Sequence, residues 1–336
     1  MFTLDQIRHI DIEITNNCNA LCPQCTRTPK DGSVVQYGDF LNFNTFKDRF
    51  TPSFLNQLEV ISFNGNTGDS VMHPDVIDFC QYVVEHSTGV VSLMTNGSMR
   101  DKLFWSKLGQ IFNTTRTRVK FALDGLADTH ELYRVNTDWD LILSHAKSFI
   151  DAGGQAVWQM IVFKHNQDQI EACRTMAKEY GFVEFDLVKS DRFPADGELK
   201  VYKRGEYSHT INKATVELTT NKVDKSQSFK KISFDNTNIQ CKSQEIKWLG
   251  IYADGTVWPC CFMMGFHKMT SPWTAPIRNH INKYLELGTD LSTINLNVHS
   301  IEEILASKFY QKSLTDSFSK YPNPVCISHC SKKIVK

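Results

Sequence analysis

Three cysteines near the N-terminus have the spacing of a metal-binding loop. Cys18, Cys22 and Cys25 form a CxxxCxxC pattern that follows the alternating run 10–14, Ile-Asp-Ile-Glu-Ile. Three thiolates on one short loop can hold three irons of a [4Fe-4S] cluster and leave the fourth iron open to another ligand. Cysteine-rich loops also bind zinc, but no fourth ligand lies beside these cysteines. The spacing, together with the strand pattern before it, favours the iron–sulfur cluster.

A second group of cysteines lies near the C-terminus. It comprises Cys241, Cys260, Cys261, Cys326 and Cys330. Asp254-Gly255 predicts a hairpin between 248–252 and 256–258, which lets cysteines distant in sequence meet at one site. We expect all of the group except Cys261 to be the ligands of a closed site, and Cys261 is the alternative to Cys260. A four-cysteine zinc site is the alternative to iron–sulfur here.

Size and charge limit the classes of protein to consider. The chain has 336 residues, 41% of them hydrophobic, so it can bury a large core and suggests about two domains. Basic and acidic residues both total 37, and the zero net charge gives no electrostatic case for a nucleic-acid partner. Without a signal-peptide core or a membrane-spanning apolar stretch, a soluble, cytoplasmic protein is expected. Ten cysteines in a reducing compartment favour metal ligation over disulfides.

The N-terminal part of the chain alternates β-rich runs with helical patterns. We expect strands at 9–14, 60–64, 90–95, 118–123, 156–163 and 184–188. Helical patterns such as 75–86 and 167–180 lie between them, with Cys80 and Cys173 on apolar faces as core residues. Six strand–helix units predict a parallel sheet with right-handed crossovers, built as a partial barrel or an open doubly wound sheet. Both architectures bind ligands at the carboxyl ends of the strands, where the CxxxCxxC loop leaves the first strand.

The chain is expected to divide into three parts. Residues 1–195 form the α/β domain, and residues 236–336 form a small domain around the second cysteine group. Between them, residues 196–235 are polar, rich in Lys, Thr, Ser and Asn, and only weakly periodic. We expect this stretch to be a linker or a loop on the substrate side, because loops of this length are often functional or mobile.

The CxxxCxxC loop after the first predicted strand resembles that of the radical S-adenosylmethionine (SAM) superfamily. The resemblance implies an α/β fold, a partial (β/α)6 TIM-like barrel, whose cluster binds the amino and carboxylate groups of SAM at its open iron. It also implies that an electron breaks a carbon–sulfur bond of SAM and releases a 5′-deoxyadenosyl radical. A reducing partner such as flavodoxin or ferredoxin is implied as the source of that electron.

Further segments resemble cofactor-binding positions of the family. The turn after the second strand resembles the glycine-rich motif for the SAM amino group, which implies contacts from Thr67, Gly68 and Asp69. Asp69 stands where the family has glutamate, and an ordinary Asn- and Gly-rich turn is the alternative. Asn96 and Asp124, at the ends of the third and fourth strands, match positions that line the cofactor, and Asp124 is a candidate acceptor for the ribose hydroxyls. Turn and capping chemistry is the alternative for both.

Positions on the fifth and sixth strands complete the implied SAM site. Gln159 is expected to point into the barrel, where a polar side chain needs a partner, either SAM or a structural hydrogen bond. Arg192 follows the sixth strand and is a candidate clamp for the SAM carboxylate, with Lys189 as its competitor. Gln24 departs from the family, which usually has an aromatic residue just before the third cysteine, against the adenine. The departure leaves the iron ligands unchanged.

The C-terminal cysteines resemble the auxiliary-cluster domain of the SPASM/twitch subfamily of these enzymes. The longer SPASM form has seven cysteines and two auxiliary clusters. Because this chain lacks the extra CxxC pairs, it resembles the shorter twitch form, an α+β domain with one auxiliary [4Fe-4S] cluster. The implied ligands are Cys241, Cys260, Cys326 and Cys330.

The two clusters together imply a radical oxidation. The 5′-deoxyadenosyl radical takes hydrogen from an unactivated carbon, and a closed auxiliary cluster can accept the electron left on the substrate. We therefore expect a radical SAM oxidoreductase, of dehydrogenase or peptide-modifying type, that acts on a peptide, a protein or a small polar molecule. The sequence names no general base. A cysteine-rich zinc protein that binds nucleic acid or has a structural role is the alternative.

Overall fold

The computed structural model describes residues 2–28, 38–190, 192–194, 196–203, 205–217, 237–265, 267–268, 279–280 and 291–333. Its strands are β1 (His9–Ile12), β2 (Val60–Phe63), β3 (Val90–Thr95), β4 (Thr117–Ala122), β5 (Ala156–Val162), β6 (Glu184–Lys189), β7 (Glu198–Lys203), β8 (Glu206–Asn212), β9 (Thr237–Ile239), β10 (Trp248–Ile251), β11 (Val257–Trp258) and β12 (Ser331–Lys333). Its helices are α1 (Phe43–Arg49), α2 (Pro52–Asn56), α3 (Val76–His86), α4 (Lys102–Ile111), α5 (Ala127–Tyr133), α6 (Trp139–Asp151), α7 (Ile170–Tyr180), α8 (Lys242–Ile246), α10 (Ile301–Ala306), α11 (Leu314–Lys320) and α12 (Pro324–Cys330). None of the helices in these ranges is both long and apolar enough to span a lipid bilayer.

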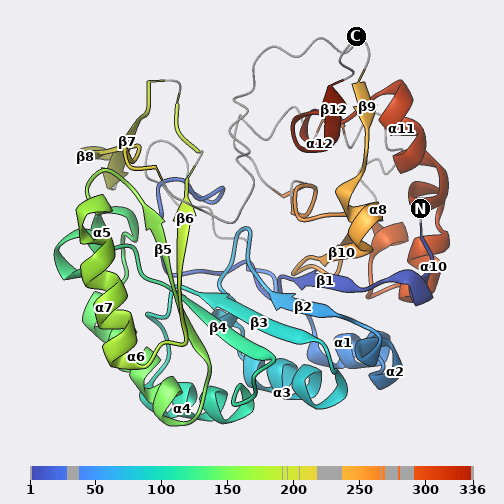
Figure 1. Cartoon of the computed structure of the whole chain (residues 1–336). Helices are drawn as coiled ribbons and strands as arrows, with labels where there is room; N and C mark the ends of the chain where they lie inside the picture. The colour runs from blue at the N-terminus through green and yellow to red at the C-terminus, as the bar shows by residue number, and fades with distance from the viewer. Residues whose placement is uncertain are drawn as a thin grey trace.

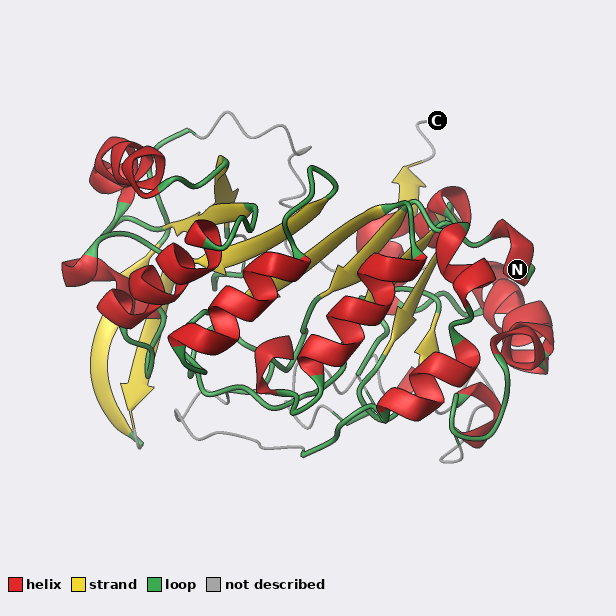
Figure 2. Cartoon of the chain, turned by 90° about the horizontal axis from the view of Figure 1, so that it is seen from below, coloured by secondary structure: helices red, strands yellow, loops and turns green. Residues whose placement is uncertain are grey.

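The central sheet has eight strands in the order β11-β10-β1-β2-β3-β4-β5-β6. Strands β1 to β6 are parallel, and helices connect each of them to the next. Helices α3, α4, α6 and α7 cover the outer face of the curved sheet (Figures 1 and 2). This arrangement confirms the predicted α/β fold, a partial (β/α)6 barrel, and places the carboxyl ends of β1 to β6 at one edge.

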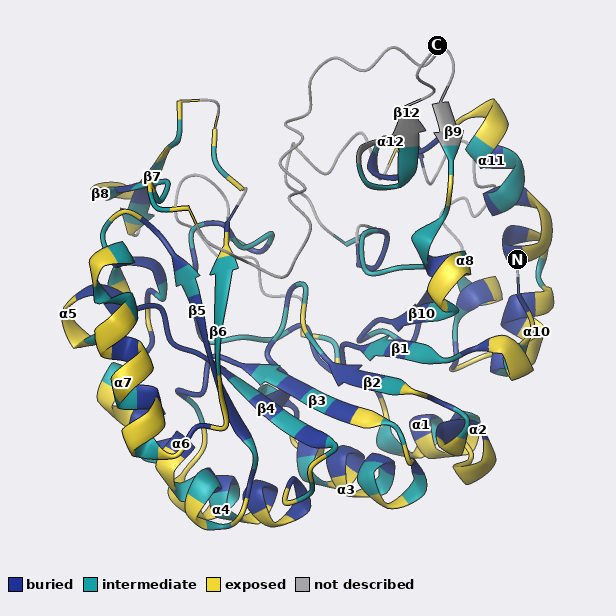
Figure 3. Cartoon of the chain, in the orientation of Figure 1, coloured by how far each residue is buried: buried dark blue, intermediate teal, exposed yellow. Residues whose placement is uncertain are grey.

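The two faces of the sheet differ in polarity. Ile10 and Ile12 are buried in the main hydrophobic core. Asp11 projects to the opposite face, where it lies beside Ser62 in the register of β1 and β2. The hydroxyl of Ser92, one strand further along, donates to the Ser62 hydroxyl (3.2 Å). The alternation in the run 10–14 thus separates a core-facing side from a polar inner side. Figure 3 shows buried residues along β1 to β5 and exposed residues on the outer sides of α4 to α7.

The C-terminal part of the chain adds a hairpin to the same sheet. Strand β10 pairs in parallel with β1, with Ile12 opposite Ile251, and β11 pairs antiparallel with β10. The connecting turn contains Asp254-Gly255, and Gly255 has a φ of +87°, a conformation that glycine adopts without strain. The predicted hairpin is confirmed, and it joins the two predicted domains through one continuous sheet.

The polar stretch 196–235 is more regular than the sequence predicted. Where we expected a linker or a loop, β7 and β8 form an antiparallel hairpin. Val201 and Ile211 of this hairpin are buried in a small hydrophobic cluster with Ala20 and Cys22 of the cysteine loop. The apolar residues of β7 and β8 are few and stand among polar ones, so their alternating pattern is too short to be recognised as a strand from the sequence. Residues 218–236 lie outside the described residues.

Predicted boundaries elsewhere lie close to the observed ones. The third strand begins and ends where it was predicted, whereas β1 ends two residues before the predicted limit, at Ile12. The helical pattern 167–180 consists of a short 3-10 helix, Gln167–Gln169, followed by α7. Cys80 and Cys173 are fully buried in the core, as predicted.

Candidate active site and auxiliary cluster site

The CxxxCxxC loop leaves β1 at the carboxyl edge of the sheet and is held there by hydrogen bonds. Within the loop, the amide of Cys25 donates to the carbonyl of Cys22 (2.9 Å). The amide of Leu21 donates to the carbonyl of Val135, just after α5 (2.8 Å), and Asn19 Nδ2 donates to the hydroxyl of Ser98, just after β3 (2.8 Å). The loop is therefore fixed against the segments that follow β3 and β4, where the sequence predicted the cofactor.

Side-chain N–H groups point at two of the three thiols. Asn96 Nδ2 lies 3.5 Å from Cys18 Sγ, and Arg134 Nη1 lies 3.7 Å from Cys22 Sγ. Burial raises the pKa of both thiols, and Arg134 opposes that rise at Cys22. Cys22 interacts electrostatically with Cys18 and with Cys25, so the three thiols lie near one another. Buried, neighbouring thiols with N–H donors fit an iron–sulfur cluster, whose iron charge stabilises the thiolates.

A buried glutamate organises the turn that we predicted to contact the SAM amino group. Glu13 Oε1 accepts hydrogen bonds from the amides of Thr67 and Gly68 (both 2.8 Å) and from the Thr67 hydroxyl. Glu13 Oε2 accepts from the amide of Asn66 (3.1 Å). Burial raises the pKa of Glu13 to about 7, although these hydrogen bonds oppose the rise. Gly68 has no room for a side chain, because a Cβ there would lie 1.9 Å from the carbonyl oxygen of Thr15.

Asp69 links this turn to the loop after β3. Its Oδ2 accepts from the amide of Asn96 (2.7 Å) and the hydroxyl of Thr95 (3.0 Å), and its Oδ1 accepts from the amide of Val71 (3.2 Å). The Asp69 charge raises the pKa of Cys18, so the carboxylate lies near the cysteine loop. The structure therefore brings Asp69 and Asn96 together beside Cys18, as contacts to a single ligand require.

Asp124 is fully buried and forms an ion pair with Arg134. Arg134 Nε donates to Asp124 Oδ2 (2.6 Å), and the amide of Ile161 donates to Oδ1 (2.6 Å). Both oxygens of the predicted ribose acceptor thus already accept hydrogen bonds from the protein. The pair holds the guanidinium against Cys22, and the contact of Asp124 with ribose stays a prediction.

Gln159 has a partner inside the protein. Its Nε2 donates to Asp186 Oδ2 (2.9 Å) on β6, and the same oxygen lies 3.4 Å from Lys120 Nζ on β4. This contact is the structural hydrogen bond that the sequence offered as an alternative to SAM, and a contact with SAM stays a prediction.

Hydrogen bonds of Gln24 connect Arg192 to the cysteine loop. Gln24 Nε2 donates to the Arg192 carbonyl (2.7 Å), and Gln24 Oε1 accepts from the Ser190 hydroxyl (2.6 Å). The glutamine at the position where the family usually has an aromatic residue thus ties the cysteine loop to the chain after β6. This tie brings the Arg192 backbone to the loop, and its clamp role stays a prediction.

The four predicted auxiliary ligands form one group. The thiol of Cys260 interacts electrostatically with Cys241 and Cys330, and that of Cys326 interacts with all three of these. Burial raises the pKa of Cys260 to about 12. The cysteines line a cavity of about 470 Å³ formed by α8, α11, α12 and the chain around β11. A space of this kind, lined by thiols and apolar side chains, fits a closed [4Fe-4S] cluster.

Cys261 lines the same cavity but has different neighbours. Its thiol interacts electrostatically with Asp11, on the inner side of β1, and with Arg192, as well as with the adjacent Cys260. This difference in surroundings supports Cys260 as the ligand and Cys261 as a residue between the cavity and the barrel. Within the described residues, no three His, Cys, Asp or Glu side chains converge tightly enough to hold a single metal ion.

Sequence reasoning missed two residues of this site. Arg134 lies between Tyr133 and Val135, both buried, and a charge in such apolar surroundings signals a buried partner. Glu13 belongs to the run 10–14, which we used only to predict a strand. An acid in a strand that enters a ligand-binding edge was the available signal.

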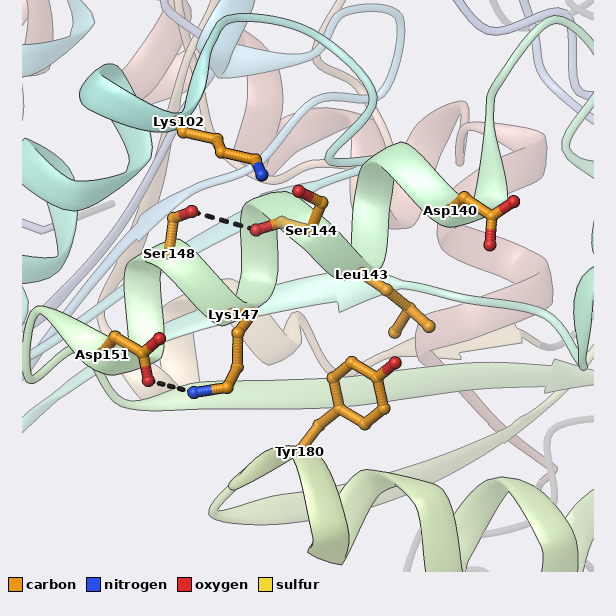
Figure 4. Close-up of a pocket in the computed structure, with 8 residues that line it drawn as sticks. All are labelled: Lys102, Asp140, Leu143, Ser144, Lys147, Ser148, Asp151 and Tyr180. Atoms are coloured by element: carbon orange, nitrogen blue, oxygen red, sulfur yellow. Dashed lines mark hydrogen bonds and ion pairs between the residues drawn. The ribbon is translucent and has the colours of Figure 1, made fainter.

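A separate cavity of about 370 Å³ lies on the outer helical layer, between α4, α6 and α7 (Figure 4). Lys147 pairs with Asp151 along α6, and the Ser148 hydroxyl donates to the carbonyl of Ser144 (3.0 Å). None of the predicted cluster ligands or SAM contacts lines this cavity, so we assign it no part in the site.

Comparison with known families identifies the C-terminal part of the chain. Residues 241–331 match the SPASM family, described as an iron–sulfur cluster-binding domain. The match spans all four predicted auxiliary ligands. A search of curated proteins finds no significant match to the chain.

Solved structures share the fold at low sequence identity. SuiB of Streptococcus suis bound to S-adenosylmethionine is 13% identical, with a TM-score of 0.53 over 82% of this chain and 69% of SuiB. SuiB bound to its precursor peptide SuiA is 12% identical, with a TM-score of 0.51 over 88% and 71%. AnSMEcpe with bound AdoMet and the Cp18Cys peptide is 14% identical, with a TM-score of 0.51 over 92% and 83%.

These comparisons confirm the predicted resemblance in fold and in the C-terminal domain. The chain shares its fold with SuiB and anSMEcpe, and its residues 241–331 match the iron–sulfur cluster-binding domain of the SPASM family. At these identities the likeness to the solved structures concerns the fold.

Proposed function

We propose that this protein is a radical SAM oxidoreductase with one auxiliary [4Fe-4S] cluster. The observation that carries the proposal is the CxxxCxxC loop, held at the carboxyl edge of a partial barrel beside Asp69, Asn96 and Arg134. When bound there, a [4Fe-4S] cluster and SAM supply a 5′-deoxyadenosyl radical that removes hydrogen from the substrate. The protein's own residues bind these groups, orient them and exclude water.

The amino group of SAM has acceptors in the turn after β2. The amides of Thr67 and Gly68 already donate hydrogen bonds to Glu13. The turn can therefore present its carbonyl oxygens and the carboxylate of Asp69 to an ammonium group. The position of Asp69 near Cys18 supports this role, since the amino group must bind at the iron that Cys18, Cys22 and Cys25 leave open.

The carboxylate of SAM has a candidate partner in Arg134. Its Nε is fixed by Asp124, and its Nη1 lies 3.7 Å from Cys22 Sγ, so the fork faces the cysteine loop. A guanidinium fork matches the two oxygens of a carboxylate. Arg192, the candidate from sequence, is the second choice.

The auxiliary cluster has the ligands Cys241, Cys260, Cys326 and Cys330 in this proposal. Four thiolates would close the cluster, which would suit it to accept the electron that a substrate radical loses on oxidation. A flavodoxin or a ferredoxin supplies the electron that starts the reaction. A peptide is the first choice of substrate because SuiB and anSMEcpe, which share the fold, have been solved with bound peptides. A small polar molecule is the second choice.

The test is SAM cleavage by anaerobically purified protein. We expect about eight irons and a similar amount of sulfide per chain, and 5′-deoxyadenosine when SAM and dithionite are added. The variant with Cys18, Cys22 and Cys25 all changed to Ala should keep about four irons and lose SAM cleavage. Retained cleavage in this variant would contradict the proposal.

The zinc alternative predicts a different metal analysis. A zinc protein without SAM chemistry would contain zinc without acid-labile sulfide and would produce no 5′-deoxyadenosine. An iron content near four per chain in the wild-type protein, with SAM cleavage intact, would contradict the presence of the auxiliary cluster but not the SAM chemistry.

A further inference from the structure

The C-terminal hairpin reaches the turn to which we assign the SAM amino group. Tyr252, directly after β10, places its hydroxyl 3.1 Å from the hydroxyl of Thr67. Asn66 Nδ2, one residue earlier in the turn, donates to the carbonyl of Cys261 (3.0 Å). The part of the chain that carries the auxiliary cysteines therefore contacts two neighbouring residues of the turn.

The hydrogen bonds at Tyr252 have a fixed direction. The Thr67 hydroxyl has one proton and donates it to Glu13, so it accepts from Tyr252. Burial raises the pKa of Tyr252, which therefore keeps the proton that it donates. Asn16 Nδ2 donates to the Tyr252 oxygen (3.3 Å). A chain of donors thus runs from Asn16 through Tyr252 and Thr67 to the buried carboxylate of Glu13.

The ring of Tyr252 is held in place by its surroundings. The residue is fully buried, and a Cβ on Gly265 would lie 2.7 Å from the ring, so the backbone of Gly265 packs directly against it. The ring of His267 packs edge-on against the Tyr252 ring, with the two ring centroids 5.4 Å apart. The hairpin therefore determines where the hydroxyl lies, and Asn16 is itself fixed by Asp39 (2.6 Å).

We infer that Tyr252 is a positioning residue for SAM, through which the C-terminal hairpin sets the conformation of the turn around Thr67. The inference rests on the proposed function, because it requires SAM to bind at that turn. Thr67 is buried, so loss of the Tyr252 hydroxyl would leave the Thr67 oxygen without this donor. The turn would then shift, and the acceptors that it presents to the SAM ammonium group would move with it.

Tyr252→Phe keeps the ring and removes the hydroxyl. In cluster-loaded protein, the Kd for SAM can be measured from the change that SAM causes in the EPR spectrum of the reduced cluster. KM and kcat can be measured from 5′-deoxyadenosine formed with dithionite. We expect Kd and KM to rise roughly two- to tenfold, with kcat and iron content close to wild type. Unchanged Kd and KM would overturn the inference.

Thr256→Val is the matched control in the same hairpin. The Thr256 hydroxyl bonds Asp254 (2.7 Å) and the indole of Trp258 (2.8 Å), and neither contact reaches the SAM turn. SAM binding should therefore stay at the wild-type value. An equal rise in Kd for Thr256→Val and Tyr252→Phe would mean that any loosening of the hairpin weakens SAM binding, and this outcome also overturns the inference.

Thr67 allows the same bond to be tested from its other end, should Tyr252→Phe fail to fold. Thr67→Ser keeps the hydroxyl that accepts from Tyr252 and Thr67→Val removes it, so the Kd for SAM should be higher in Thr67→Val than in Thr67→Ser. Equal affinities in these two variants would overturn the inference. A wild-type protein that neither binds nor cleaves SAM would refute the proposed function, and the inference with it. Normal SAM cleavage in wild type and in Tyr252→Phe, at the same KM, would refute the inference alone.

Discussion

At the scale of single residues, a buried ion pair determines the charge beside the cysteine loop. Arg134 and Asp124 have side chains that are 15% and 0% exposed. Removing either partner would leave the other buried and unpaired, at a cost of about 3–5 kcal/mol. Arg134 is therefore better tested by a substitution that keeps the charge. Lysine keeps it but lacks the fork that holds Asp124 and faces Cys22 at the same time.

We expect Arg134→Lys to fold and to load its clusters, but to raise the KM for SAM by roughly tenfold or more, the effect of one lost hydrogen bond to a charged group. Iron analysis and the rate of 5′-deoxyadenosine formation measure both properties. Arg192→Lys is the matched control and should change KM little. The reverse pattern would assign the SAM carboxylate to Arg192.

The choice between Cys260 and Cys261 can be tested by alkylation. With both clusters loaded, iodoacetamide should label Cys261 and spare the seven proposed ligands, while Cys80 and Cys173 are protected by burial. Burial, the neighbouring Cys260 and the charge of Asp11 raise the pKa of Cys261, so labelling should be faster above neutral pH. Mass spectrometry of peptides locates the label. Labelling of Cys260 in protein that retains its iron would reverse the assignment.

The sequence was informative about ligands and less so about what surrounds them. Cysteine spacing is a local property, so Cys18, Cys22 and Cys25 could be grouped without a structure. The side chain of Arg134 belongs to the site because the chain after α5 returns to the cysteine loop. The apolar neighbours of Arg134 indicate that it has a buried partner but not in which segment that partner lies. The same holds for Gln24, whose hydrogen bonds to Ser190 and Arg192 join segments far apart in sequence.

At the scale of elements, Asp254 accepts several hydrogen bonds at the turn between β10 and β11. Asp254 accepts from His267 Nε2 (2.7 Å), from the Thr256 hydroxyl (2.7 Å) and from the Thr256 amide (3.0 Å). Burial alone would raise the pKa of Asp254, but His267 and Thr256 outweigh it and lower this pKa from 3.8 to about 2. The ionised carboxylate is therefore favoured in the folded protein.

Because the folded-state pKa of Asp254 is depressed, its contribution to stability is complete above about pH 4 and disappears as the pH falls toward 2. We expect Asp254→Asn to lower the free energy of unfolding by about 2 kcal/mol at pH 7 and by about half as much near pH 3. Urea denaturation of metal-free protein at both pH values measures this difference. Asp151→Asn, at an exposed ion pair, should cost less than about 1 kcal/mol. A loss for Asp254→Asn that does not depend on pH would contradict the pKa argument.

Elements with a clear turn or a long apolar period were predictable, and others were not. Asp254-Gly255 predicted its hairpin because an Asp-Gly pair tolerates the backbone conformation of a tight turn. The hairpin of β7 and β8 has Gly205 at its turn but no Asp or Asn before it, and Val201 and Ile211 pack against an apolar surface on the cysteine loop. That surface exists only in the folded molecule.

At the scale of the whole molecule, the sheet continues from the barrel into the C-terminal part. The parallel pairing of β10 with β1 was not predicted, because it joins segments from opposite ends of the chain. The residues of β1 lie between β2 and β10, so both predicted domains depend on the same strand. Separation of the two parts would expose the unpaired backbone of β1.

We therefore expect the two predicted domains to unfold together. Hydrogen exchange of metal-free protein in increasing urea should show amides of β1, β2 and β10 opening with the same midpoint. Fluorescence and far-UV circular dichroism should report one coincident transition. Exchange in β10 at a much lower urea concentration than in β1 would show that the C-terminal hairpin is an independent unit.

The order of the strands also leaves the sheet with two ends, and each is poorly suited to recruit another chain. One end is β11, which has only two residues. The other is β6, where Glu184, Asp186 and Lys189 interrupt the apolar sequence. Charged side chains and short strands discourage edge-to-edge association of sheets. An incomplete barrel can thus stay open to a substrate without its rim becoming a template for aggregation.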